Sequence, residues 1–362
     1  MSSPLFSPLK IRSVEISNRV WVSPMCQYSA RDGVVGLWHQ IHLGAFATGG
    51  VGLIMVEATG VVPEGRISLG CPGIWNQEQA DAFKPMIEFA HSQGAKMGIQ
   101  LAHAGRKGST MLPWDDHEIA SPSEGGWETA GPSAIAYKDF PIPHEMTIEE
   151  IKGLTAKFVD ASKRAIAVGF DLIEIHAAHG YLFHQFFSPL SNQRTDQYGG
   201  SFENRIRFLV DTARAIRAAI GENFPIFARI SATDWVEGGW DIEDSVKLCL
   251  ELKNAGVDLI DVSTGGLVHD AKITTGPGYQ VSFAAKIRSE AKMLTSAVGL
   301  ITDGHQAEEI IANESADAVM IGRAMLRNPR WAIGAAEDLG EKIQWSLQLE
   351  RARRLGARKS PQ

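Results

Sequence analysis

Two histidines and a tyrosine stand together in the chain where a short apolar run ends. The run 170–175 leads directly into His176, His179 and Tyr181. An imidazole can donate a hydrogen bond to a carbonyl or nitro oxygen, and a phenol can supply a proton to a carbanion. Three such side chains at one strand end favour a site that polarises a substrate and then protonates it. The alternative, that they merely cap a strand, explains one of them more easily than all three.

The run before these residues is one of four similar octets, which begin at Gly50, Gly169, Gly256 and Ser315. Each has a small residue, then mostly an acid or glycine, then an apolar core rich in β-branched side chains. Segments with helical periodicity, such as 82–90 and 158–167, precede strand-like runs. Nearly continuous apolar strands that alternate with amphipathic helices are typical of a parallel sheet buried on both faces.

Eight strand-like runs can be assigned in this way. They are 20–25, 53–57, 96–101, 172–175, 226–230, 259–262, 294–298 and 318–321. The sequence therefore predicts an α/β protein with a single domain over residues 1–362, a (β/α)₈ (TIM) barrel. The alternative is an open, doubly wound sheet. That fold favours a Gly-x-Gly-x-x-Gly turn after the first strand, and the chain has none there.

Two segments lie outside the barrel pattern. Residues from about 105 to 146 form a long irregular stretch after the third strand, with several prolines and with Trp114 and Trp127. Long irregular loops in compact domains are usually functional, so we expect this insertion to cover the barrel mouth as a lid. Residues 340–362 form a tail that is basic in its last part, and we expect it at a subunit interface.

Composition narrows the class of protein further. The formal net charge of −7 argues against a nucleic-acid partner, because phosphate backbones need a basic surface. No run approaches the roughly 18 apolar residues of a membrane span, and the first ten residues do not resemble a secretory leader. The chain has three cysteines without a pairing pattern, which predicts a cytoplasmic protein and excludes an iron–sulfur cluster with four cysteine ligands.

Barrel enzymes place their active sites at the carboxyl ends of their strands. The candidates there are Ser23, Pro24, Cys26 and Tyr28 after the first strand, Ala58 after the second, Gln100 in the third, Arg229 in the fifth, Gly299 after the seventh, and Gly322 with Arg323 after the eighth. The last two strands commonly build a phosphate site from loop amides. Arg229 stands within a buried run and needs a partner, which a heterocycle that becomes anionic would provide.

Five motifs in this order resemble the Old Yellow Enzyme family of flavin oxidoreductases. They are residues 23–28, 100–107, 176–182, 191–205 and 321–323, and the resemblance extends from Asn18 to about Arg351. The nearest match is the thermophilic-like subclass, which includes xenobiotic reductases. This resemblance implies an ene-reductase that holds FMN noncovalently across the barrel mouth and uses NAD(P)H as reductant. Flavin N5 would then pass hydride, in a ping-pong cycle, to alkenes activated by a carbonyl or nitro group.

The resemblance also assigns roles to individual residues. His176 and His179 would bind the oxygen of the activated alkene or nitro compound, Tyr181 would protonate its α-carbon, and Tyr28 would line the pocket. Cys26 would lie near the flavin and tune its potential. The expected isoalloxazine contacts are Ser23, Pro24, Ala58, Gln100 and Arg229, and the expected phosphate contacts are Gly299, Gly322 and Arg323.

A homodimer or homotetramer is also implied, because the subclass often inserts a C-terminal arginine into a neighbouring subunit's active site. Arg351 matches this position. The chain departs from the pattern in two respects, since eleven residues follow Arg351 and Leu349 stands where an aromatic residue is common.

The two histidines are also compatible with another class of enzyme, a metal-dependent hydrolase. His176 and His179 have the spacing of a metal-binding pair in a hydrolytic barrel. Such a site needs a third histidine or a carboxylate at the strand ends, and Glu57 is the one candidate there. No metal is therefore predicted.

Overall fold

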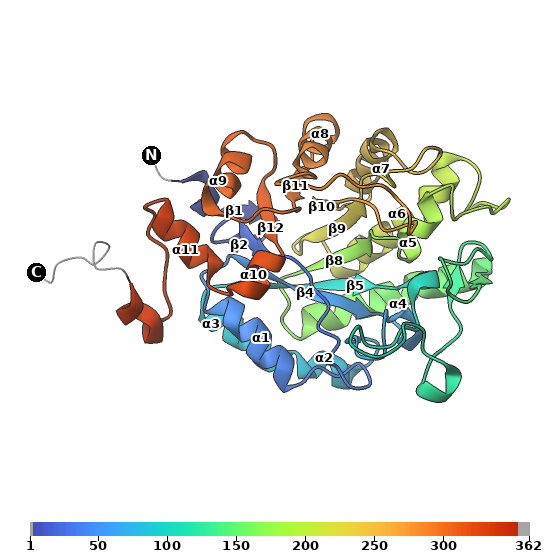
Figure 1. Ribbon diagram of the computed structural model, residues 1–362, viewed down its shortest axis with the longest axis horizontal. Coiled ribbons are helices and arrows are strands. Elements are labelled where there is room, and N and C mark those ends of the chain that lie inside the picture. Colours follow the sequence, from blue (N-terminus) through green and yellow to red (C-terminus); the bar gives the residue numbers. More distant parts are fainter. Residues whose placement is uncertain (1–2, 354–362) are drawn as a thin grey trace, which may run out of the picture.

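The computed structural model describes residues 3–353, and its centre is a closed barrel of eight parallel strands (Figure 1). The strands are β3 (Val20–Val22), β4 (Leu53–Gly60), β5 (Lys96–Ala102), β8 (Leu172–Ala177), β9 (Ile226–Ser231), β10 (Leu259–Ser263), β11 (Leu294–Ala297) and β12 (Ala318–Ile321). Each strand pairs with its neighbour in this order, and β12 pairs with β3 to close the barrel. The predicted (β/α)₈ fold is confirmed.

Helices surround the barrel and connect its strands (Figure 1). They are α1 (Leu37–Ala47), α2 (Gln77–Ala82), α3 (Lys84–Ser92), α4 (Ile148–Ala167), α5 (Leu182–Phe187), α6 (Phe202–Ile220), α7 (Ile242–Asn254), α8 (Val281–Ala291), α9 (Gly304–Ala312), α10 (Arg323–Arg327) and α11 (Trp331–Asp338). Local signals explain their limits. Thr147 and Glu150 form a capping box at the start of α4, and Pro85 in the first turn of α3 separates it from α2.

The amino-terminal end of the barrel is closed by a hairpin that the strand pattern did not predict. Its strands are β1 (Leu9–Ile11) and β2 (Val14–Ile16), which pair antiparallel. The apolar side chains of the hairpin pack in one cluster with Trp21, Phe227 and neighbouring barrel residues. The rings of Trp21 and Phe227 stack with their centroids 5.8 Å apart. The interior is therefore apolar at this end, which leaves the opposite end for chemistry.

Two strand boundaries differ from the expectation in a way that matters for the site. The first barrel strand ends at Val22, not at residue 25, because Pro24 has no N–H to donate to a ladder. The second strand continues to Gly60, and its register against β5 shifts between Val56 and Thr59. Glu57 consequently turns away from the barrel axis to His39 of α1, and Ala58 joins the apolar cluster at the mouth.

The insertion of residues 105–146 folds onto the rest of the domain. It contains the short helices η3 (Gly105–Lys107) and η4 (Pro122–Glu124) and the short strands β6 (Ala130–Gly131) and β7 (His144–Glu145). The Arg106 guanidinium donates to the carbonyls of Ile135 and Ala136 within the insertion and of Leu267 beyond β10. One buried cation therefore ties the insertion to the barrel loops.

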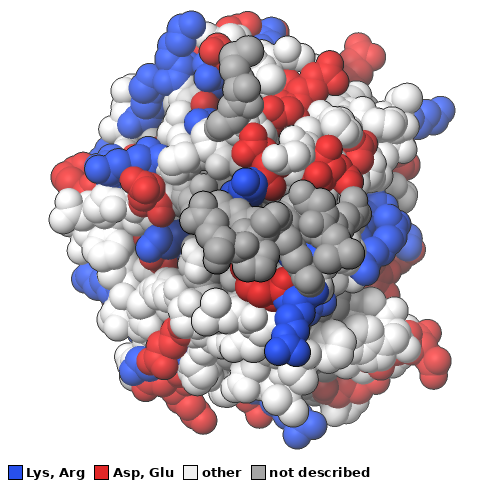
Figure 2. Space-filling model, turned by 90° about the vertical axis from the view of Figure 1, so that its left-hand side faces the viewer, with Lys and Arg blue, Asp and Glu red and all other residues white. Residues whose placement is uncertain are grey.

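The surface carries mixed charge. On the face that Figure 2 displays, acidic and basic side chains are interspersed with neutral ones. Within residues 3–353, no helix has the length and apolar character that a bilayer crossing requires.

Candidate active site

His176, His179 and Tyr181 lie together at the carboxyl end of β8, as predicted. The ring centroids of His176 and His179 are 5.3 Å apart, and those of His176 and Tyr181 are 4.9 Å apart, both edge to face. His176 is the last inward-facing residue of the strand, and the other two follow in the turn before α5. The three polar groups therefore share one small volume.

Both histidines are neutral. Burial, and then the charge of Arg229, hold the pKa of each imidazole well below its usual range. His176 Nδ1 accepts from the Ala178 N–H at 3.3 Å, so the neutral ring carries its proton on Nε2, where it can be donated. His179 Nε2 lies 2.7 Å from the Ser263 hydroxyl. A neutral imidazole that donates a hydrogen bond suits a substrate oxygen and not a cation.

The turn that carries Tyr181 is held by a buried histidine–carboxylate pair. His184 Nε2 lies 2.7 Å from Asp234 Oδ1, and its Nδ1 accepts from the Gly180 N–H at 2.9 Å. Neither His184 nor Asp234 is exposed to solvent. Next to Gly180, His179 has a positive φ of 59°, a conformation that non-glycine residues keep only where the surroundings enforce it. The turn is thus held in place by the His184–Asp234 pair and by the backbone conformation of His179.

Tyr181 keeps its proton. Burial raises the pKa of its phenol well above the usual value, and the nearby Cys26 and Tyr28 act in the same direction. A phenol of this kind is protonated at neutral pH and can yield its proton to a carbanion, which is far more basic.

Lys107 supports the same turn from the insertion side. Its Nζ donates to the carbonyls of His179 and Gly266, both at 2.8 Å, and lies 5.3 Å from the centroid of the Tyr181 ring. Burial, followed by the charge of Arg106, lowers the pKa of Lys107 to about 8. An ammonium group at this position adds positive potential beside the two histidines.

Cys26, Tyr28 and Ala58 form one wall of the mouth. They pack in a cluster with Ala102 and Cys71, and Tyr181 contacts the same cluster. A hydrogen bond with Cys71, and then burial, raise the pKa of the Cys26 thiol well above its usual value. Cys26 is therefore an uncharged thiol at neutral pH.

A buried polar layer lies one step deeper in the barrel. Arg229 NH2 donates to Ser23 Oγ at 3.2 Å, and its Nε lies 2.9 Å from Asp261 Oδ2. Gln100 Nε2 donates to Glu174 Oε1 at 2.8 Å. Of the predicted contact residues, Ser23 and Arg229 thus contact each other, and Gln100 contacts Glu174 of the same layer. Pro24 follows Ser23 directly and is partly exposed.

The candidate phosphate residues lie at the ends of β11 and β12. Gly299 has a φ of 122°, and a Cβ there would approach Gln280 Nε2 to 2.9 Å. A Cβ on Gly322 would meet no atom closer than 3.7 Å, so the space beside it is open to a ligand, and the Arg323 side chain is exposed next to it. The end of β12 therefore has open space beside a cationic side chain, as the predicted phosphate site requires.

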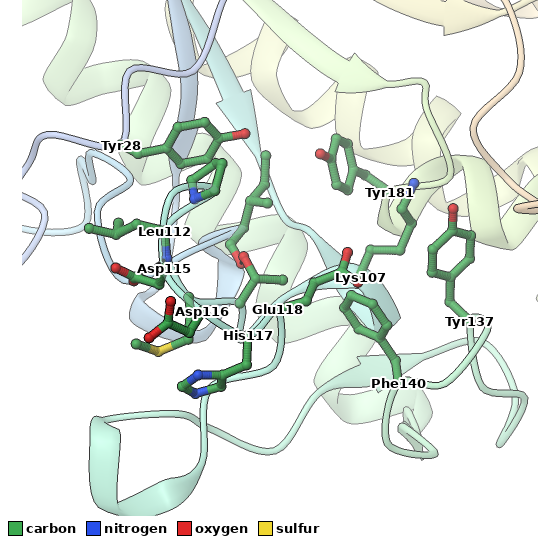
Figure 3. A pocket seen from close by; sticks show the side chains of 14 residues that line it. Tyr28, Lys107, Leu112, Asp115, Asp116, His117, Glu118, Tyr137, Phe140 and Tyr181 are labelled. Atoms are coloured by element: carbon green, nitrogen blue, oxygen red, sulfur yellow. Dashed lines mark hydrogen bonds between the residues drawn. The ribbon is translucent and has the colours of Figure 1, made fainter.

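A cavity of about 550 Å³ opens between the mouth and the insertion. Figure 3 shows Tyr28 and Tyr181 facing each other across it, with Lys107 between Tyr181 and Tyr137. Residues 110–118 of the insertion, including Leu112 and Glu118, also line this cavity. The volume of the cavity suits a small organic substrate.

One prediction is not tested by this structure, and one alternative finds no support in it. Arg351 lies in the exposed helix η5 (Leu347–Ala352) and is not part of the cavity wall, so its insertion into a neighbouring subunit's site stays a prediction. The metal-site alternative has no support, because residues 3–353 contain no group of three His, Cys, Asp or Glu side chains placed to bind an ion.

The residues of the site that were not predicted include Lys107, Glu174 and Asp261. Each stood within a motif or octet that drew attention to its neighbours. Glu174 is two residues before His176 and Asp261 is two before Ser263, so each faces the same side of its strand as the residue at the mouth. The sequence did contain a signal for Glu174 and Asp261, because each is an acidic residue within an otherwise apolar strand.

Comparison with known proteins places this site in a family. Residues 4–342 match the model of the NADH:flavin oxidoreductase / NADH oxidase family. An NADPH dehydrogenase of Geobacillus thermodenitrificans is 48% identical over 97% of this chain and 99% of its own length. An NADH:flavin oxidoreductase of Gibberella zeae is 45% identical over 96% of this chain and 89% of its own length.

Solved structures agree. Morphinone reductase superposes with a TM-score of 0.79 at 28% identity and covers 95% of this chain and 91% of its own. An Old Yellow Enzyme homologue from Zymomonas mobilis gives a TM-score of 0.76 at 26% identity over 95% of both chains. The chain therefore belongs to the Old Yellow Enzyme family and is an NAD(P)H-dependent flavin oxidoreductase with FMN as its cofactor.

Proposed function

We propose that the protein reduces the C=C bond of alkenes conjugated to a carbonyl or nitro group. The observation that carries this proposal is the grouping of two neutral histidines with a protonated tyrosine around one volume, beside a small cavity. Bound FMN supplies hydride transfer, first from NAD(P)H and then to the substrate.

The chain's own residues supply polarisation and the proton. His176 Nε2–H donates to the substrate oxygen, with His179 beside it, and charge that develops there is stabilised by Lys107 and Arg229. Tyr181 holds a proton on its phenol oxygen and transfers it to the α-carbon. Residues 110–118 line the side of the cavity in which the alkene would lie.

The same residues are suited to hold FMN. Ser23, Gln100 and Arg229 offer polar contacts to the ring, small residues such as Ala58 leave space for it, and Gly299, Gly322 and Arg323 would hold its phosphate. In support, Arg229 is buried within the barrel and its NH2 donates to Ser23 Oγ, which follows the first barrel strand.

Steady-state turnover of an activated alkene tests the proposal directly. With NADPH, 2-cyclohexenone, N-ethylmaleimide and a nitroalkene should each yield the saturated product, whereas the matched allylic alcohol 2-cyclohexenol should not react, because it has no oxygen that becomes anionic. Product analysis by gas chromatography distinguishes the outcomes. Rapid flavin reduction by NADPH without turnover of any of the three alkenes would refute the proposal.

Replacing Cys26 by Ala should shift the flavin midpoint potential by tens of millivolts, where about 30 mV corresponds to 1.4 kcal/mol for two electrons. The uncharged thiol lies in the wall of the mouth, so its weak dipole acts differently on the oxidised and reduced cofactor. Spectroelectrochemical titration measures the shift. Cys249→Ala is the matched control, since that thiol is buried in α7 outside the mouth. An unchanged potential with unchanged kinetics and a lower Tm would show that Cys26 only packs.

A further inference from the structure

Three charged side chains occupy one level of the barrel interior, directly beneath the residues of the mouth. They are Glu174 of β8, Arg229 of β9 and Asp261 of β10, on three consecutive strands. Glu174 and Asp261 are completely buried, and Arg229 is 5% exposed. The alkene chemistry proposed above uses Arg229 but assigns no role to either carboxyl group.

The charges in this layer do not balance if both carboxyl groups are ionised. Two carboxylates would then share one guanidinium in a region without solvent, which leaves a net negative charge at high cost. The other polar side chains that face these groups are Gln100, Ser23 and Ser296, and none of them carries a charge. His176, on the same strand as Glu174, is neutral. One proton on a carboxyl group would remove the imbalance.

The contacts indicate which carboxyl group holds that proton. Asp261 Oδ1 accepts from Ser296 Oγ at 2.8 Å, and Oδ2, although it accepts no hydrogen bond, forms an ion pair with the Arg229 guanidinium, with Nε 2.9 Å away. Glu174 Oε1 accepts from the Gln100 amide, but its buried Oε2 has neither a hydrogen bond nor an ion pair with another described residue. An unpartnered carboxylate oxygen is costly to bury, so Glu174 gains more from protonation.

Electrostatics agrees with this assignment. Burial, and then the negative charge of Asp261, raise the pKa of Glu174 to about 8, although Arg229 and Gln100 oppose the shift. Burial also raises the pKa of Asp261, against the effects of Arg229 and Ser296. The two groups titrate as a pair that keeps one proton at neutral pH.

We propose that Glu174 holds this proton beneath the cofactor and thereby makes the reduction of bound FMN dependent on pH. The proposal rests on FMN binding, which the family establishes, and is independent of alkene reduction. Glu174 acts as a positioning and proton-holding residue, since it contacts Gln100 and not a reacting atom.

The direction of the effect follows from linkage. Reduction adds negative charge above the layer, and like charge raises the pKa of Glu174 further. Above pH 8, Glu174 is ionised before reduction, and reduction then draws one proton from solvent onto its carboxylate oxygen. Each additional pH unit makes reduction tenfold less favourable, which is about 30 mV for two electrons. Below pH 8 the proton is already present, and this extra dependence is absent.

Potentiometric titration of the holoenzyme on both sides of pH 8 tests the proposal. The midpoint potential of the parent should fall more steeply above this pH than that of Glu174→Gln, by about 30 mV per pH unit. Asp261→Asn removes the charge that raises the pKa of Glu174, so the break should move to lower pH. Asp258→Asn is the matched control. It removes a carboxylate that precedes β10 and pairs with Arg12 and Arg217, at the far end of the barrel, and should not move the break.

A second measurement needs neither cofactor nor substrate. The infrared spectrum of the apoprotein should contain the C=O band of a protonated carboxyl group that disappears as the pH rises through about 8. Glu174→Gln should lack this band. If that variant does not fold, Asp261→Asn and the band of the parent still decide the question. A Glu174→Gln enzyme with the parent's pH dependence, or an apoprotein without the band, would overturn the proposal, whatever the result with alkenes.

Discussion

Replacing Tyr181 by Phe should slow alkene reduction by about 10²–10⁴-fold, the usual contribution of a general acid. The phenol is held protonated by burial beside His176, and its removal takes away the proton source while leaving the ring in place. Reduction of the flavin by NADPH needs no such proton and should continue at the parent rate. Stopped-flow measurement of the two half-reactions separates these steps.

Tyr198→Phe provides the matched control for loss of a phenol, because Tyr198 is buried against Phe186 and not at the mouth. It should leave both half-reactions unchanged. If the Tyr181→Phe enzyme reduces cyclohexenone as fast as the parent, Tyr181 is not the proton donor.

Replacing Arg229 by Met should have the largest effect on the cofactor and on stability. The variant leaves Asp261 without its cation in a fully buried layer, which typically costs about 3–5 kcal/mol in the free energy of unfolding. It also removes the positive charge that we expect to contact the flavin, so FMN should be lost on dialysis. Urea denaturation of the apoprotein and the absorbance of retained flavin measure the two effects.

Two further variants separate stability from cofactor binding. Arg217→Met breaks a pair with Asp258 at the other end of the barrel. Asp258 keeps Arg12 as a partner, so this variant should lower stability by less than the Arg229 variant and without loss of FMN. Arg229→Met combined with Asp261→Asn should recover part of the stability and none of the FMN binding. Full retention of FMN by the single Arg229 variant would contradict this role.

The sequence predicted the barrel because its strands are buried on both faces and therefore read as apolar runs. It predicted the mouth residues because strand ends converge in a barrel. The hairpin β1–β2 was missed because each of its strands has three residues, too few for a pattern to emerge. The role of the Glu174–Asp261 layer was missed for another reason. Which charged side chains contact each other depends on the register between neighbouring strands. This register cannot be predicted from the sequence of any one strand.

The residues that support the turn at Tyr181 were likewise not predictable from the sequence. The motif 176–182 identified the residues that do the chemistry, but their support comes from Asp234 and from Lys107, which lie far away in the chain. Such supports depend on three-dimensional contacts between loops. They were accessible only from the structure.

The register shift in β4 has a consequence for how this mouth can change. Without it, the alternation of Leu53 and Met55 would continue with Glu57, and a carboxylate would take the place of Ala58 beside the cofactor. Instead, Glu57 accepts from the Gln27 N–H at 2.7 Å and lies 3.1 Å from His39, outside the barrel. Substitutions at these two positions alter one side chain at a time. Deletion of Ala58 would instead remove the extra residue of the register shift and bring Glu57 to the mouth, so a change of length in this strand is more damaging than a change of residue type.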